Sequence, residues 1–252
     1  MEVTQVKRDE ISFFDSVLKG QKYDEFHEDY YVDILNLLKL SNVATSKIVL
    51  DVGCGSGAWG IRLAGIGYVV VGVDISKTLI KSARDWANAA DVNFMPILGD
   101  VERLPLRTEA FEICFCGYVL HHFKRLNHIV GELSRILKPQ SEIFAIEPNG
   151  SNIINKLART IMTVFPQQWV MEKGIATSNE RVHEIKSYVR VFNKTGFASV
   201  RFLAISRKRN STPLRLGLID LLKFGRELLF DICHRTTTSV IGETELLMRA
   251  SK

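Results

Sequence analysis

The 252-residue sequence predicts an α/β fold in which helices pack on both faces of a doubly wound, mainly parallel sheet. Two observations indicate this fold. Short apolar runs rich in β-branched residues alternate with helical patterns through the middle of the chain. The first run ends in a glycine cluster that opens a helix, and right-handed crossovers between such strands place helices on both faces.

Each element of this core follows from a local pattern. Five apolar runs have the length and composition of buried strands. Ser76 is a suitable cap for the helix that follows it, and Pro139 is expected to end the helix before it. The expected strands are residues 48–52, 68–73, 92–98, 111–116 and 141–146, and the expected helices are residues 58–64, 77 to about 90, and 126–137.

The regions on either side of the core have helical patterns, and two further strands are expected near the C-terminus, at residues 199–205 and 243–250. An apolar helical insert separates these two strands. The expected division of the chain is an N-terminal helical lid (1–45), a cofactor-binding core (46–150), a helical cap on the substrate side (151–195) and the final strands (196–252) with the insert at about 207–240.

Composition places the chain among ordinary globular proteins, with 46% hydrophobic and 24% charged residues. A net charge of +5 is compatible with an anionic ligand or nucleic acid but requires neither. The four cysteines have no second Cys or His pair at zinc-ligand spacing, so no metal site is expected. The absence of an apolar N-terminal stretch or a long apolar segment predicts a cytoplasmic protein without a transmembrane helix.

The segment from Asp51 to Gly57 is the most informative part of the sequence, because a strand leads there into Gly53, Gly55 and Gly57. Glycines allow positive φ angles and a close approach of the backbone to a ligand. In open α/β sheets, ligands bind at the carboxyl ends of the strands. The loop is therefore expected to border a nucleotide-like site.

Two interpretations of this loop compete. Residues 55–60 satisfy G-x-G-x-x-G, and Asp74 lies near the position of a ribose-binding carboxylate, which keeps an NAD-dependent oxidoreductase open. However, Asp51 would repel a pyrophosphate and attract a cation such as an ammonium group. Asp100 also follows a strand, and its carboxylate can accept a hydrogen bond from an adenine amine. Three acids at successive strand ends favour a ligand with an ammonium, a ribose and an adenine.

In these motifs the chain resembles class I S-adenosylmethionine-dependent methyltransferases, and in particular the small-molecule branch that contains quinone C-methyltransferases. The resemblance covers about residues 45–150. The matching motifs are residues 49–57, 71–76, 99–101, 104–106, 111–113, 120–122 and 137–139.

The resemblance implies a Rossmann-like seven-stranded sheet whose last strand is antiparallel, and it implies roles for individual residues. S-adenosylmethionine is the implied cofactor and S-adenosylhomocysteine its product. Asp51 would lie near the methionine ammonium, Asp74 would hold the ribose, and Asp100 would bind the adenine amine. The implied cofactor-binding residues are Tyr23, Asp51, Gly53, Gly55, Gly57, Asp74, Ile75, Asp100, Val101, Cys116 and Gly117.

The catalytic candidates are His121 and His122, which follow the fourth strand near the expected methyl position. An imidazole can act as a general base near neutral pH, although the pair can equally orient its loop and cap the next helix. Glu147 ends the fifth strand and could face the acceptor or cap a helix. Tyr23 could reach across the cofactor or simply pack beneath a lid.

The sequence predicts transfer of a methyl group to a small acceptor. The apolar residues Phe165, Trp169 and Met171 of the cap are compatible with an apolar acceptor or with an apolar core of the cap itself. The helix at residues 213–232 could contact a membrane surface, the cap or a second copy in a dimer. RNA or protein methylation remains an alternative, but no RNA-binding module is evident. A non-catalytic cofactor-binding subunit also stays open.

Overall fold

The computed structural model describes residues 4–17, 48–152, 180–205 and 245–252, together with scattered positions between 155 and 177. Several predicted features lie outside the described residues, and the interpretations that depend on them stay predictions. They are Tyr23 with the rest of the N-terminal lid, Trp169, and the insert at about 207–240.

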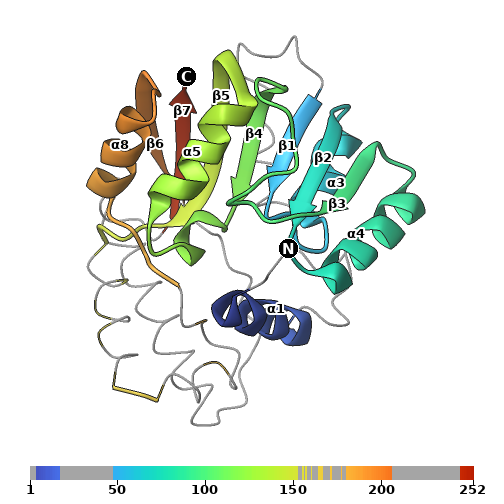
Figure 1. Cartoon of the computed structure of the whole chain (residues 1–252), viewed down its shortest axis with the longest axis horizontal. Helices are drawn as coiled ribbons and strands as arrows, with labels where there is room; N and C mark the ends of the chain where they lie inside the picture. The colour runs from blue at the N-terminus through green and yellow to red at the C-terminus, as the bar shows by residue number, and fades with distance from the viewer. Residues whose placement is uncertain are drawn as a thin grey trace.

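A seven-stranded sheet in the order β3-β2-β1-β4-β5-β7-β6 forms the centre of the molecule (Figure 1). The first five strands are parallel to one another, and β7 is antiparallel to both β5 and β6. This confirms the predicted doubly wound sheet with an antiparallel last strand. The strands are β1 (Ile48–Val52), β2 (Val69–Asp74), β3 (Phe94–Leu98), β4 (Phe111–Gly117), β5 (Leu137–Pro148), β6 (Ser199–Ile205) and β7 (Glu245–Ser251).

The described helices begin and end close to the positions that the sequence predicts. The predicted cap is present: Ser76 Oγ accepts a hydrogen bond of 3.1 Å from the backbone N–H of Leu79. The helices are α1 (Gln5–Val17), α3 (Ala58–Gly65), α4 (Lys77–Ala90), α5 (Leu126–Ile136) and α8 (Ile185–Lys194), with a short 3₁₀ helix η2 (Leu120–His122) between β4 and α5.

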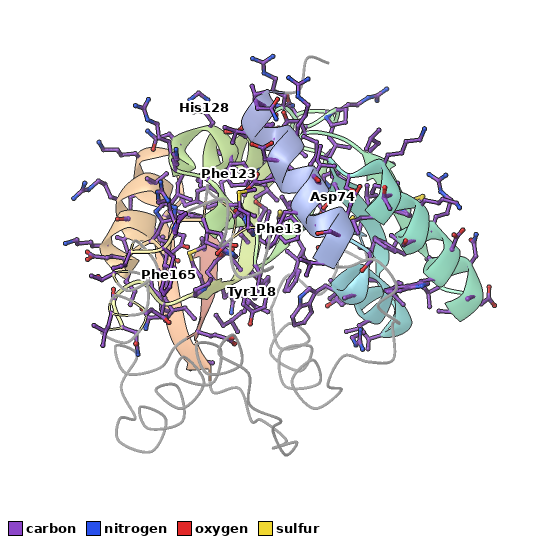
Figure 2. All side chains as sticks on the ribbon, turned by 90° about the horizontal axis from the view of Figure 1, so that it is seen from below. Phe13, Asp74, Tyr118, Phe123, His128 and Phe165 are labelled. Atoms are coloured by element: carbon purple, nitrogen blue, oxygen red, sulfur yellow. The ribbon has the colours of Figure 1, made fainter. Side chains whose placement is uncertain are left out.

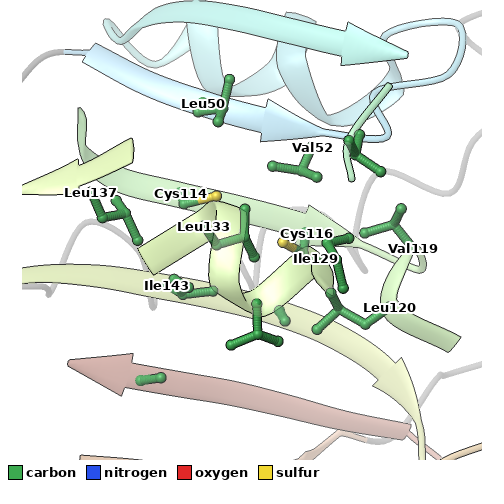
Figure 3. Packing of buried hydrophobic residues seen from close by; sticks show 14 of the residues in the cluster. Leu50, Val52, Cys114, Cys116, Val119, Leu120, Ile129, Leu133, Leu137 and Ile143 are labelled. Carbon is green, nitrogen blue, oxygen red and sulfur yellow. The ribbon is translucent and has the colours of Figure 1, made fainter. Parts of the chain in front are cut away.

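Alternate side chains of the central strands enter two separate cores. Leu50, Cys114 and Cys116 face the core beneath α5 and α8, and the side chains of this layer interlock closely (Figure 3). Val49 and Phe115 face the other core, beneath α3 and α4. The alternation is that of strands buried on both faces, as the apolar runs predict.

Helix α1 does not join either layer. It lies across the carboxyl ends of the parallel strands, at the end of the sheet where the glycine loop is found (Figure 1). Phe13 is its buried residue and forms an edge-to-face pair with Phe14, with ring centroids 5.2 Å apart. The first segment of the predicted lid therefore covers the predicted site.

Candidate functional site

The predicted site residues that the structure describes gather at the carboxyl ends of β1 to β5. Figure 2 looks onto these ends, with α1 crossing in front of them and Asp74 labelled beside the helix. Strand order β3-β2-β1-β4-β5 places the ends in one continuous row. This is where ligands bind in open α/β sheets.

The glycine loop between β1 and α3 has the backbone conformation that the sequence suggests. Gly53, Gly55 and Gly57 have φ angles of 63°, 52° and 93°, in the left-handed region that side chains disfavour. A Cβ atom at Gly53 would also lie 2.5 Å from Val119 Cγ2. Glycine is therefore favoured in this loop, most strongly at Gly53, where both the positive φ angle and the nearby Val119 side chain disfavour a Cβ atom.

Asp74 holds the glycine loop from the end of β2. Its Oδ2 accepts a hydrogen bond of 2.9 Å from the Gly55 N–H, and its Oδ1 accepts one of 2.8 Å from the Ser76 N–H. Burial raises the pKa of Asp74, while these backbone bonds oppose the increase. The carboxylate is thus fixed at the rim of the loop, where a diol can bind its remaining lone pairs.

Asp51 is buried beneath the loop with only 1% of its surface exposed. Burial raises its pKa to about 8, and the negative charge of Asp74 adds to the increase. Within the described parts of the chain, its Oδ2 atom has no hydrogen-bond partner. A buried carboxylate oxygen without a partner is costly, and an ammonium group would satisfy it.

Asp100, which follows β3, is bonded by a residue that sequence analysis missed. Lys7 of α1 lies 2.5 Å from Asp100 Oδ2 and 2.8 Å from Glu102 Oε2. Burial alone would lower the pKa of Lys7, but the two carboxylates raise it. The resemblance assigns the adenine amine to the Asp100 carboxylate, but one oxygen of this carboxylate is already bonded to Lys7.

The other predicted cofactor residues differ in what they can offer. Ile75 and Gly117 are partly exposed at the ends of β2 and β4. Val101 is 8% exposed and packs in the core, and Cys116 is wholly buried among core residues. The Cys116 side chain therefore faces away from the strand ends, so that this position can approach a cofactor only through its backbone.

Both the backbone and the ring of His121 are hydrogen-bonded to the Glu147 carboxylate. The Glu147 carboxylate accepts hydrogen bonds from the backbone N–H groups of Val119, Leu120 and His121, at 3.1, 2.7 and 3.1 Å. His121 Nδ1 lies 2.8 Å from Glu147 Oε2. Burial alone lowers the pKa of His121, but Glu147 raises it overall, with smaller contributions from Glu180 and Glu10. Glu147 thus fixes both the η2 backbone and the imidazole.

His122 faces α1 rather than Glu147. Its Nδ1 lies 3.4 Å from Glu10 Oε1, and its ring contacts that of Phe14 edge to face at 5.1 Å between centroids. The two imidazoles are themselves only 4.1 Å apart between centroids. The candidate catalytic pair therefore lies between the sheet and α1, on the opposite side of the glycine loop from Asp100.

Helix α1 supplies the contacts that the sequence did not reveal. Besides Lys7 and Glu10, it brings Asp15 to α4, where Asp15 accepts hydrogen bonds from Ser76 Oγ (2.5 Å) and Thr78 Oγ1 (2.9 Å). The helical pattern of this region indicated a lid. Its charged residues carried no such signal, because charges on an amphipathic helix usually face solvent.

Comparison with known proteins supports the methyltransferase resemblance in the central part of the chain. A family model described as a methyltransferase domain matches residues 50–145, from β1 into β5. The chain carries a class I methyltransferase domain. The matched range contains the glycine loop, all three strand-end acids and both histidines of the candidate pair.

Relatives and solved structures agree with this assignment. Demethylmenaquinone methyltransferase of Listeria monocytogenes is 26% identical over 189 residues, covering 69% of this chain and 80% of the relative. Ubiquinone biosynthesis O-methyltransferase of Coxiella burnetii is 34% identical over 98 residues, covering 39% and 42%. These relatives support SAM-dependent methylation of a small molecule and give no support to the macromolecule or NAD alternatives.

Solved structures confirm the fold. A SAM-dependent methyltransferase from Thermotoga maritima aligns with a TM-score of 0.65 at 14% identity, over 97% of this chain and 99% of that chain. One from Archaeoglobus fulgidus gives 0.61 at 16% identity, over 94% and 99%. Among the described residues, no helix is both long and apolar enough to cross a membrane.

Proposed function

We propose that this methyltransferase domain binds S-adenosylmethionine across the ends of β1, β2 and β3 and methylates a small acceptor placed beside His121 and His122. The observation that carries the proposal is the buried Asp51 carboxylate, whose Oδ2 has no partner among the described residues. An ammonium group placed there gains a charge-assisted hydrogen bond in a site of low dielectric.

The residues around Asp51 fit the rest of this cofactor. Asp74 would hold the ribose hydroxyls, the positive-φ glycines would follow the methionine part, and Ile75 would pack against the adenine. When bound, the sulfonium supplies an activated methyl group. The chain's own contribution is then to align donor and acceptor and to exclude water, which can provide a large share of the rate increase.

The acceptor side of the site is proposed to lie between η2 and α1. His121 and His122 would border this space together with Phe14, whose ring contacts that of His122 and would provide an apolar wall. We propose that the N-terminal lid (1–45) and the cap (151–195) enclose the acceptor here. Glu147 acts as a positioning residue in this scheme, because all of its observed bonds fix η2 and His121.

A methyl-transfer assay tests this proposal. Purified protein would be incubated with labelled S-adenosylmethionine and a panel of phenols, quinols and amines, with product formation measured against heat-treated protein. We expect turnover of at least one hydroxylated or quinol acceptor, because the chain is similar to a demethylmenaquinone methyltransferase and to a ubiquinone biosynthesis O-methyltransferase. Cofactor binding without turnover of any small acceptor, but with labelling of added RNA or protein, would contradict it.

A further inference from the structure

A cluster of metal-binding side chains lies on the acceptor side of the site. His121, His122 and Glu180 each offer one ligand atom, and these three atoms lie within 4.8 Å of one another. The two histidines belong to η2, and Glu180 belongs to the segment before α8. The Arg181 N–H donates a 2.5 Å hydrogen bond to the His121 carbonyl, so the two segments are joined directly at the cluster.

The tautomer of His121 is set by its neighbour. Glu147 is 1% exposed, and its carboxylate faces three backbone N–H donors as well as His121 Nδ1. A carboxylate can only accept, so Nδ1 must carry the hydrogen. The lone pair of neutral His121 is therefore on Nε2. Histidines that bind metals almost always have this arrangement, with the other ring nitrogen donating to a carboxylate.

The remaining members of the cluster are also suited to a cation. Within the described residues, His122 Nδ1 is buried and makes no hydrogen bond, although Glu10 Oε1 lies 3.4 Å away. Glu180 Oε1 accepts a bond of 3.1 Å from the Thr177 N–H, which fixes its carboxylate. The carboxylates of Glu10, Glu147 and Glu180 thus surround two imidazoles.

We propose that His121, His122 and Glu180 bind a divalent transition-metal ion, with zinc the best match. Two imidazoles and one carboxylate form a set that zinc binds in sites with an open position. Bonds of about 2.0–2.2 Å place tetrahedral ligand atoms roughly 3.4 Å apart, so ligand atoms that lie within 4.8 Å of one another need to approach by at most about 1.4 Å. The open position would face the acceptor space.

This inference revises the expectation that the chain has no metal site. Ligand spacing in the sequence is informative when ligands come in close pairs, whereas Glu180 is far from the histidines along the chain. The binding site itself does not depend on methyl transfer. Its proposed use, to orient a hydroxyl or carbonyl oxygen of the acceptor, rests on the proposed function. An imidazole that holds the metal is then a ligand and not a general base.

The test is metal binding by the full chain in the absence of cofactor. Protein treated with a chelator would be titrated with Co²⁺, followed by the visible absorption of the tetrahedral complex, and with Zn²⁺ by calorimetry. We expect one ion per chain. His122→Gln and Glu180→Gln should each weaken binding by at least about tenfold, since even outer-shell changes cost about 10- to 100-fold.

The matched control is His128→Gln, because His128 is an exposed histidine on α5. This variant should bind Co²⁺ as the parent does. Circular dichroism of each variant would confirm that it is folded. The inference is overturned if folded parent protein takes up no Co²⁺ or Zn²⁺, or if His122→Gln and Glu180→Gln bind as tightly as the parent. Because cofactor is absent, failure here leaves the proposed function standing.

Discussion

Replacing Glu147 by alanine should produce a large loss of stability, because its carboxylate accepts hydrogen bonds from three consecutive backbone N–H groups. Three backbone N–H groups and the His121 ring donate to it, and it is 1% exposed. Removing one partner of a buried, charged network costs about 3–5 kcal/mol, since the remaining groups stay buried without partners. Total stabilities are about 5–15 kcal/mol.

Urea denaturation, monitored by circular dichroism, measures this loss. The control is Glu112→Ala, since Glu112 is 31% exposed and paired with Lys138 at 2.9 Å. An ion pair this exposed contributes about 0–1 kcal/mol. A Glu147→Ala protein that loses less than about 1 kcal/mol, or no more than the control, would refute the view that Glu147 organises η2.

Further predictions concern Asp51, Lys7 and Gly150. Asp51, with a pKa of about 8, is mostly protonated at pH 7. A bound ammonium group lowers that pKa, so binding of S-adenosylhomocysteine should release about one proton. Calorimetry in buffers of different ionisation enthalpy measures this release and should show none for Asp51→Asn. In the ligand-free protein the same raised pKa makes stability fall as pH rises from about 4 towards 8. Urea titrations at several pH values should show a smaller fall for Asp51→Asn than for the parent, and an equal fall in both proteins would contradict the assignment to Asp51. Lys7→Met removes the ammonium from the acid that follows β3, which should tighten cofactor binding by on the order of 1 kcal/mol; calorimetry that shows weaker binding would mean that Lys7 supports the site instead. Gly150→Ala places a Cβ against the backbone carbonyl of His183, which should cost about 1–3 kcal/mol, whereas Gly131→Ala has open space and a melting curve should show no loss.

The sequence predicted the strands well because most of them are short and largely apolar, but it placed the start of β5 wrongly. Residues 126–137 were expected as one helix ended by Pro139, whereas α5 ends at Ile136 and β5 already begins at Leu137. Pro139 lies where β5 pairs with β4 only through Leu137, before regular pairing resumes at Glu142. A proline costs no ladder bond at such an irregularity, so it did not break the strand.

The cofactor side of the site was largely predictable, because acids that follow parallel strands must meet at one edge of the sheet. The contacts of α1 were not. Lys7 and Asp100 are 93 residues apart, and no local pattern connects them. Glu180 lies before α8, which begins at Ile185, and no local pattern connects it with the two histidines. Tertiary packing therefore brings Glu180 to the histidines, and this is information that a local sequence pattern does not contain.

The central claim is that the acids at the strand ends form a site for S-adenosylmethionine. The most direct measurement is a calorimetric titration of the parent protein and Asp74→Ala with S-adenosylhomocysteine, with NAD as a parallel titrant. The account predicts micromolar binding of S-adenosylhomocysteine, no binding of NAD, and at least about a tenfold loss in folded Asp74→Ala, because buried charge-assisted hydrogen bonds are lost. Binding of NAD alone, or unchanged affinity in the folded variant, would contradict it.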